Sequence, residues 1–150
     1  MTDKKEFTAI LLEQDGDSVN ASIKTIPDDR LPEGDVTVAI KYSTLNYKDG
    51  MIISGIGRLV RDYPHVAGID CAGMVIASDN ADYKAGDEVI MTGWRFGEAH
   101  WGGLATKTRV KAEWLVPLPA GMTLEHAMAI GTAGLTAMLA IMALEDHGLK

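Results

Sequence analysis

The chain has 150 residues, of which 47% are hydrophobic and 23% charged, a composition typical of a soluble globular protein large enough to bury a core. Its 21 acidic and 14 basic residues give a formal net charge of −7 at pH 7, which disfavours a general nucleic-acid or anionic-membrane surface. The single cysteine, Cys71, excludes an internal disulfide and is typical of a protein from a reducing cytoplasm.

The first two thirds of the chain have the pattern of short strands separated by turns. Residues 7–12 and 19–23 flank the turn signal Asp15-Gly16-Asp17 and predict a hairpin. The alternating, β-branched run 36–42 predicts a strand. Further strands are expected at 72–77, 88–91, 104–110 and 114–116, and a short helix at 48–54.

After Gly121 the pattern becomes helical. Thr123 suits a helix N-cap, apolar residues follow from Leu124 at helical spacing, residues 131–134 interrupt them, and residues 135–146 resume the helix. The first six residues lack the apolar core of a signal peptide, and the longest apolar stretch, 135–144, is shorter than the roughly 20 residues that span a bilayer. The sequence therefore predicts a β-barrel-like domain followed by a helical segment, with no membrane anchor.

Several motifs carry information through their order and spacing. They are the run 45–49 (Leu-Asn-Tyr-Lys-Asp), the run 68–73 (Gly-Ile-Asp-Cys-Ala-Gly), and the segments 92–94, 97–103 and 130–137. Together they resemble the N-terminal catalytic domain of the medium-chain dehydrogenase/reductase superfamily, and within it the acrylyl-CoA reductase branch of the quinone-oxidoreductase-like enzymes. The resemblance implies a mainly β fold with helices, the partly open GroES-like barrel, over residues 1–121. It also implies that residues 122–150 form a helical connector toward a Rossmann domain beyond this chain.

Two positions in these motifs bear on metal binding. In zinc-dependent members of the superfamily, the counterpart of Asn46 is a cysteine and that of Ile69 is a histidine. Asparagine is a poor zinc ligand and isoleucine is none, and the sequence contains no Cys-x-x-Cys pair for a structural zinc. We therefore expect no metal. Cys71, within a Gly/Ala-rich run, is expected to be a small buried residue.

The activity implied by the resemblance is NADPH-dependent reduction of the 2,3 double bond of acrylyl-CoA or a similar short 2-enoyl-CoA. Tyr47 and Asn46 are the expected catalytic residues. The Tyr47 phenol would lie against the nicotinamide and substrate, and would donate to the enolate or protonate carbon. The alternative is that Tyr47 only packs against the ring. Asn46 either orients the substrate carbonyl or caps the turn that follows. Lys48 and Asp49 are candidates for a local ion pair.

Further residues are candidates for binding. Arg58 and Arg61 suit the phosphates of coenzyme A, because arginine recognises phosphate through two parallel hydrogen bonds. Trp94 and Trp101, in a glycine-rich loop that the resemblance places near the substrate cleft, are candidates to cover the acyl chain or the adenine. The alternative for Arg58 and Arg61 is that they are solvated surface residues. The alternative for Trp94 and Trp101 is that their loop is purely structural. Thr132 and, as a weaker candidate, Thr136 are expected to contact the cofactor, since the family position of Thr132 lies beside the nicotinamide. The alternative is that the segment 131–134 only caps the helix that follows.

The Gly-rich turn between a strand and a helix that binds a dinucleotide is missing from these residues. Residues 131–134 lie between helical segments and do not qualify. We therefore expect the 150-residue chain alone to have little or no reductase activity. The full-length enzyme is expected to be a cytoplasmic homodimer. Two alternatives remain open at this stage: a reductase of quinones or free α,β-unsaturated carbonyls, and a non-catalytic GroES-like binding module.

Overall fold

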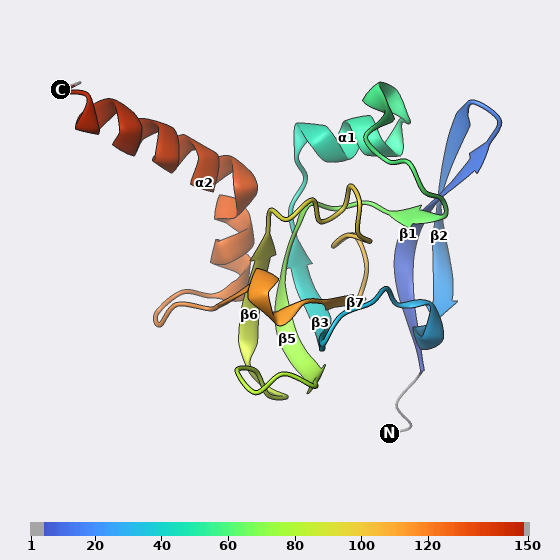
Figure 1. Cartoon of the computed structure of the whole chain (residues 1–150), viewed down its shortest axis with the longest axis horizontal. Coiled ribbons are helices and arrows are strands. Elements are labelled where there is room, and N and C mark those ends of the chain that lie inside the picture. The colour runs from blue at the N-terminus through green and yellow to red at the C-terminus, as the bar shows by residue number, and fades with distance from the viewer. Residues whose placement is uncertain (1–4, 149–150) are drawn as a thin grey trace.

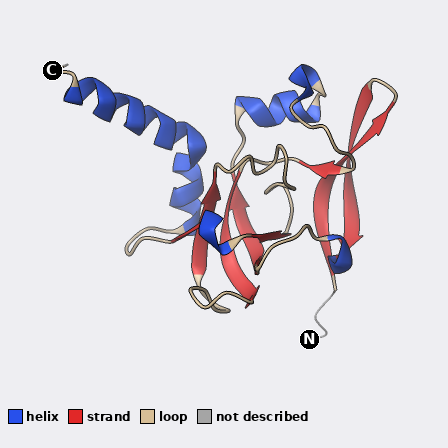
Figure 2. Ribbon diagram, in the orientation of Figure 1, coloured by secondary structure: helices blue, strands red, loops and turns tan. Residues whose placement is uncertain are grey.

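The computed structural model describes residues 5–148 and has two sheets, short helices and one long C-terminal helix (Figures 1 and 2). The helices are α1 (Tyr47–Ile53) and α2 (Leu124–Asp146), with 3-10 turns η1 (Asp28–Arg30), η2 (Ile56–Arg58) and η3 (Ala112–Trp114). The strands are β1 (Glu6–Asp15), β2 (Ser18–Pro27), β3 (Val36–Ser43), β4 (His65–Val66), β5 (Asp70–Ser78), β6 (Glu88–Thr92), β7 (Lys107–Val110) and β8 (Leu115–Pro117).

The strands form a three-stranded sheet, β2-β1-β4, and a five-stranded sheet, β7-β3-β5-β6-β8, with every strand pair antiparallel. An isolated bridge between Ala9 and Ala105, and a hydrogen bond from the Ile10 amide to the Leu104 carbonyl (3.0 Å), join the first sheet to the segment before β7. The sheets approach each other without closing, which confirms the predicted mainly β, partly open barrel.

The predicted hairpin is present, although both of its strands, β1 and β2, are longer than the predicted ranges 7–12 and 19–23. Asp15 pairs with Ser18 across a turn in which Gly16 has a φ of 58°. The predicted strand 36–42 is β3, which buries Val36 and Val38 in the main core cluster. It pairs with β5 so closely at Gly73 that an added Cβ there would lie 2.2 Å from the carbonyl oxygen of Ala39. The two-residue strand β4 was not predicted, since it is too short to show alternation.

Helix α2 begins as predicted, with the Thr123 hydroxyl accepting a hydrogen bond from the His126 amide (3.1 Å). Its first turns are held on the five-stranded sheet, where Leu124, Ala127 and Met128 form a buried cluster with Ala72. The predicted interruption at 131–134 is confined to one residue, Gly131, whose φ of 50° and ψ of −163° are not helical. The structure otherwise assigns one helix of 23 residues.

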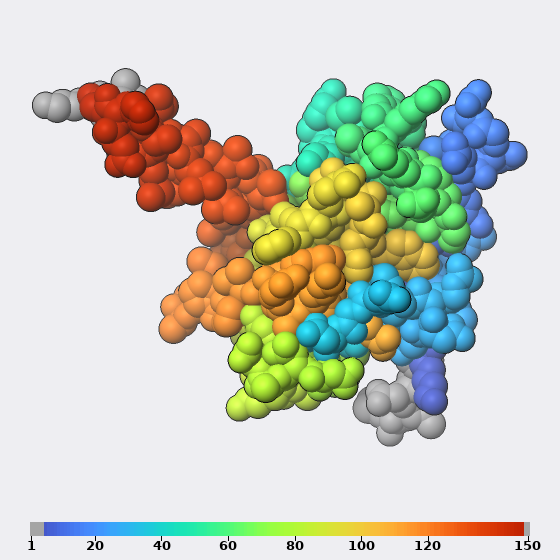
Figure 3. Space-filling model, viewed as in Figure 1, coloured from blue at the N-terminus to red at the C-terminus, as the bar shows by residue number. Residues whose placement is uncertain are grey.

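Beyond Gly131, α2 extends away from the barrel (Figure 3). Six large apolar side chains of this part are exposed, namely Leu135, Met138, Leu139, Ile141, Met142 and Leu144. With its 23 residues from Leu124 to Asp146, the apolar helix is longer than the stretch 135–144 that the sequence indicated. By length and composition alone α2 is long and apolar enough to cross a membrane, a property it shares with core helices of soluble proteins.

Candidate functional site

The first turn of α1 carries the expected catalytic pair. Asn46 is its N-cap residue, in an extended conformation, and its backbone amide donates to Asp49 Oδ2 (2.8 Å). Tyr47, the first helical residue, is 88% exposed, and its phenol hydroxyl forms no hydrogen bond with any residue between 5 and 148. The phenol therefore lies at the surface next to Asn46, and none of the hollows described below includes it.

The buried carboxylate of Asp70 lies at the centre of the site. Asp70 is the first residue of β5 and has no exposed surface. Its Oδ2 accepts from Asn46 Nδ2 (2.9 Å) and from the Thr132 amide (3.0 Å), and its Oδ1 accepts from Thr132 Oγ1 (2.5 Å). The sequence reasoning gave Asp70 no role. The available signal was one acidic residue in the otherwise uncharged run 68–73.

A second buried carboxylate, Asp49, stabilises the same corner. Its Oδ1 accepts from the Ile69 amide (3.0 Å), and its Oδ2 lies 3.4 Å from Asn46 Nδ2 in addition to its bond from the Asn46 backbone. The expected ion pair between Lys48 and Asp49 is therefore wrong. Asp49 points into the protein, whereas Lys48 Nζ pairs with Glu98 Oε1 at 2.9 Å. That pair connects α1 to the loop 93–103.

Of the expected cofactor residues, Thr132 is joined to Asn46 through Asp70. Its position follows from the break at Gly131, where an added Cβ would lie 3.0 Å from Asp70 Oδ2 and 2.8 Å from Thr44 Cγ2. Thr136 lies one turn further along α2 and donates its hydroxyl to the Thr132 carbonyl (2.7 Å). The Thr136 hydroxyl hydrogen is thus already used within the helix.

The two positions relevant to zinc lie in different surroundings. Ile69 is buried in a cluster with Leu12, Ile52 and Val60, while the Asn46 amide faces the two carboxylates. Among residues 5–148 there is no group of three or more His, Cys, Asp or Glu side chains that could hold a metal ion. Cys71 is buried as expected, and its burial, followed by the charge of Asp70, raises the pKa of its thiol.

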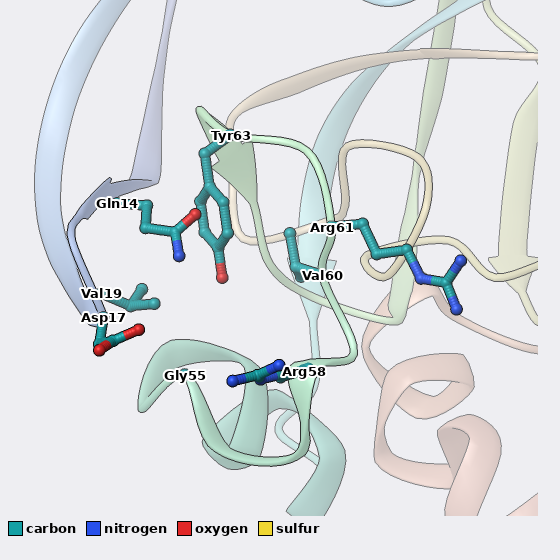
Figure 4. Close-up of a pocket in the computed structure, with 8 residues that line it drawn as sticks. All are labelled: Gln14, Asp17, Val19, Gly55, Arg58, Val60, Arg61 and Tyr63. Atoms are coloured by element: carbon teal, nitrogen blue, oxygen red, sulfur yellow. The ribbon is translucent and has the colours of Figure 1, made fainter.

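Arg58 and Arg61 border one hollow of about 670 Å³ between η2 and the tip of the β1-β2 hairpin (Figure 4). The other residues lining it are Gln14, Asp17, Val19, Gly55, Val60 and Tyr63. Arg58 has a left-handed backbone (φ 49°). The Arg61 side chain points away from Arg58 in Figure 4, and it also borders a smaller hollow of about 140 Å³ shared with Arg95. The two guanidinium groups therefore do not converge on one point.

Trp94 and Trp101 lie in different environments, although one loop carries both. Trp94 is exposed, has a left-handed backbone (φ 53°) and stacks on Trp114 with ring centroids 6.2 Å apart. Trp101 packs against the cluster around Phe7 and donates its indole N–H to the Pro64 carbonyl (3.0 Å). Because the indole N–H of Trp101 is bonded within the protein, a structural role is favoured for this residue.

Residues 32–120 match the family described as the alcohol dehydrogenase GroES-like domain. The chain belongs to this family of GroES-like domains, and the resemblance inferred from its motifs is confirmed. It is 57% identical over 145 residues to acrylyl-CoA reductase AcuI of Ruegeria pomeroyi, covering 95% of this chain and 44% of that protein. It is 43% identical over 144 residues to the putative quinone oxidoreductase YhfP of Bacillus subtilis, covering 96% of this chain and 44% of that protein.

A solved structure extends the comparison. Escherichia coli K-12 YhdH with bound NADPH superposes with a TM-score of 0.92 at 53% identity, over 95% of this chain and 44% of that one. This chain thus spans less than half the length of the relatives that it matches.

Proposed function

We propose that this chain is the GroES-like part of an NADPH-dependent reductase that reduces the 2,3 double bond of acrylyl-CoA, or of a similar short 2-enoyl-CoA. The observation that supports this most directly is the 57% identity, over 95% of the chain, to a protein named acrylyl-CoA reductase. In this proposal residues 1–121 are the catalytic domain, and residues 122–150 connect it to a nucleotide-binding domain.

The reaction needs a hydride at C3 of the acyl chain, stabilisation of the thioester oxygen as an enolate forms, and a proton at C2. NADPH supplies the hydride when it is bound. The task of this chain is to hold the partners and to place a donor. The Tyr47 phenol suits that role, because it is exposed beside Asn46 and is not hydrogen-bonded to the described residues.

The residues of this chain fit the nicotinamide end of the cofactor but not its pyrophosphate. Thr132 and Thr136 follow the break in α2, next to the corner that carries Asn46 and Tyr47. No strand–glycine-rich turn–helix occurs in residues 5–148. The glycine at the break, Gly131, follows a helical turn and is packed against Thr44 and Asp70. Binding of the NADPH pyrophosphate is therefore assigned to the nucleotide-binding domain.

We further propose that the complete enzyme works without zinc, as a cytoplasmic homodimer. Zinc independence is supported by the identities of Asn46 and Ile69, since neither side chain is an effective zinc ligand. The location and the dimer follow from the family resemblance. Loss of activity on dialysis against a zinc chelator, with recovery on adding Zn²⁺, would contradict zinc independence.

A second candidate function is favoured by YhfP, whose name is putative quinone oxidoreductase. An assay of NADPH oxidation separates the acrylyl-CoA reductase from the quinone reductase. It uses the protein extended to the length of its relatives, and compares acrylyl-CoA, a simple quinone and a free enone as substrates. We expect the highest kcat/KM with acrylyl-CoA, and no comparable turnover by the 150-residue chain. A preference for the quinone would favour the second candidate, and no reaction with any of the three would favour a non-catalytic module.

For the coenzyme A portion, we propose phosphate contacts from Arg58 and Arg61. Neither arginine forms an ion pair or hydrogen bond with residues 5–148, and both border the same hollow. Comparing acrylyl-CoA with acrylyl-pantetheine, which lacks the phosphates of the nucleotide, tests this. Arg58→Ala and Arg61→Ala are expected to raise KM for the CoA ester alone, whereas Arg30→Ala, in η1 outside the hollow, serves as the control. Equal effects on both esters would refute the phosphate contacts.

A further inference from the structure

The carboxylate of Asp70 joins two segments that are distant in sequence. Asn46 lies 24 residues before it and Thr132 lies 62 residues after it, and both donate to it. The backbone of Asp70 is itself held, because Ser43 Oγ donates to its carbonyl oxygen (2.8 Å). All of the hydrogen bonds to this buried group come from uncharged donors.

These bonds determine which way the Asn46 amide points. Its Nδ2 lies 2.9 Å from Asp70 Oδ2 and 3.4 Å from Asp49 Oδ2, and a carboxylate accepts hydrogen bonds but does not donate them. The amide nitrogen must therefore face the two carboxylates. The Oδ1 atom of Asn46 faces the Asp49 backbone amide in the capping box of α1, and its second lone pair is left for a ligand. The earlier idea that Asn46 orients a substrate carbonyl would need the amide N–H groups, which are already directed at Asp70 and Asp49.

The same reasoning applies to Thr132. A hydroxyl group has one hydrogen, and that of Thr132 is donated to Asp70 Oδ1. The Thr132 backbone N–H is also donated to Asp70. What Thr132 can still offer a ligand through these groups is the lone pairs of its hydroxyl oxygen.

We propose that Asp70 is a positioning residue that makes Asn46 and Thr132 hydrogen-bond acceptors, and so leaves the Tyr47 phenol as the uncharged donor beside them. The inference rests on the proposed function. In that setting the two acceptors recognise N–H or O–H groups of the nicotinamide half of the cofactor, such as its carboxamide or ribose hydroxyls. The enolate, which needs a donor, is paired with Tyr47.

Asp70→Asn tests this, because it keeps the shape of the side chain while replacing one acceptor by a donor. With the amide oxygen at the Oδ2 position, the new NH₂ group would donate to Thr132 Oγ1 and turn the threonine hydroxyl hydrogen outward. In the protein extended to the length of its relatives, we expect KM for NADPH to rise about tenfold or more, because the Thr132 hydroxyl would then point a hydrogen at the cofactor N–H or O–H group that it would otherwise accept.

The control is Asp35→Asn. Asp35 is a partly buried carboxylate that, like Asp70, accepts from uncharged donors, here the Ala112 amide (2.6 Å) and Asn80 Nδ2 (3.3 Å), but it contacts neither Asn46 nor Thr132. We expect it to leave KM for NADPH unchanged. Equal KM values for the two asparagine variants would overturn the inference. If Asp70→Asn does not fold, Thr132→Val and Thr132→Ser replace it: the valine variant should show the increase and the serine variant should not.

A second measurement uses the 150-residue chain alone and does not depend on activity. In its NMR spectrum the Thr132 hydroxyl proton and the Asn46 side-chain NH₂ should exchange slowly with solvent, and Asp70→Asn should shift both. Fast exchange of both groups in the unchanged chain would refute the inference. If the proposed function fails, with no NADPH oxidation by the unchanged full-length protein, the NMR result still decides whether Asp70 orients these two residues.

Discussion

The glycine at the break in α2 gives the sharpest test of how the site is built. Gly131 has φ 50° and ψ −163°, a conformation that is essentially restricted to glycine. An added Cβ would lie 2.8 Å from Thr44 Cγ2 and 3.0 Å from Asp70 Oδ2, so one of these groups must move. Backbone strain costs about 1–3 kcal/mol, and disturbing one buried hydrogen bond about 1 kcal/mol more. Gly131→Ala should therefore lower the free energy of unfolding by about 2–4 kcal/mol.

The control lies in the other helix. Gly50 is an exposed residue inside α1, and an added Cβ there would meet no atom within 4 Å. Gly50→Ala should be neutral or stabilising by up to about 1 kcal/mol, from helix propensity. Urea unfolding of this chain, followed by tryptophan fluorescence, reports on the barrel, which carries all three tryptophans. If Gly131→Ala left that transition unchanged, α2 would not be coupled to the barrel through Asp70.

Two further predictions concern buried titratable groups. Burial, its largest cause, lowers the pKa of His65 below the 6.5 of the unfolded chain, and His100 shifts in the same direction for the same reason. As the pH falls below about 6.5 the unfolded state takes up protons first, so stability present at pH 7 should be lost progressively as the pH falls below 6.5, as urea midpoints would show. A flat profile would contradict the burial of both rings. Cys71 should react with a thiol reagent in urea but not in the folded chain, since burial raises the pKa of its thiol, and rapid labelling in the folded chain would show that β5 opens.

Local patterns in the sequence were enough for most of the fold. The turn at Asp15-Gly16-Asp17, the alternation in 36–42 and the cap at Thr123 depend on neighbours a few residues apart, and each is present in the structure. The break in α2 was expected in the right place but was too long. Threonine, alanine and glycine at 132–134 can all be helical, so only Gly131, which is held against Asp70, leaves the helix.

The centre of the site could not be found in this way. The partners of Asp70 are 24 and 62 residues distant, and the partner of Lys48 is 50 residues distant. Sequence spacing favoured the adjacent Asp49 as the partner of Lys48, whereas the helix directs the two side chains to opposite sides. Motif order identified Asn46, Tyr47 and Thr132 as residues of interest. The direction of their hydrogen bonds depends on how three distant segments meet at Asp70, which the sequence does not show.

The role of the Tyr47 phenol is tested most directly by Tyr47→Phe in the protein extended to the length of its relatives. The side chain is 88% exposed and unbonded to the described residues, so losing its hydroxyl should cost the fold little. If the phenol assists enolate formation or its protonation, kcat for acrylyl-CoA should fall by about 10²–10⁴-fold, with KM for NADPH changed only slightly. A phenylalanine variant that turns over acrylyl-CoA as fast as the unchanged enzyme would contradict the account.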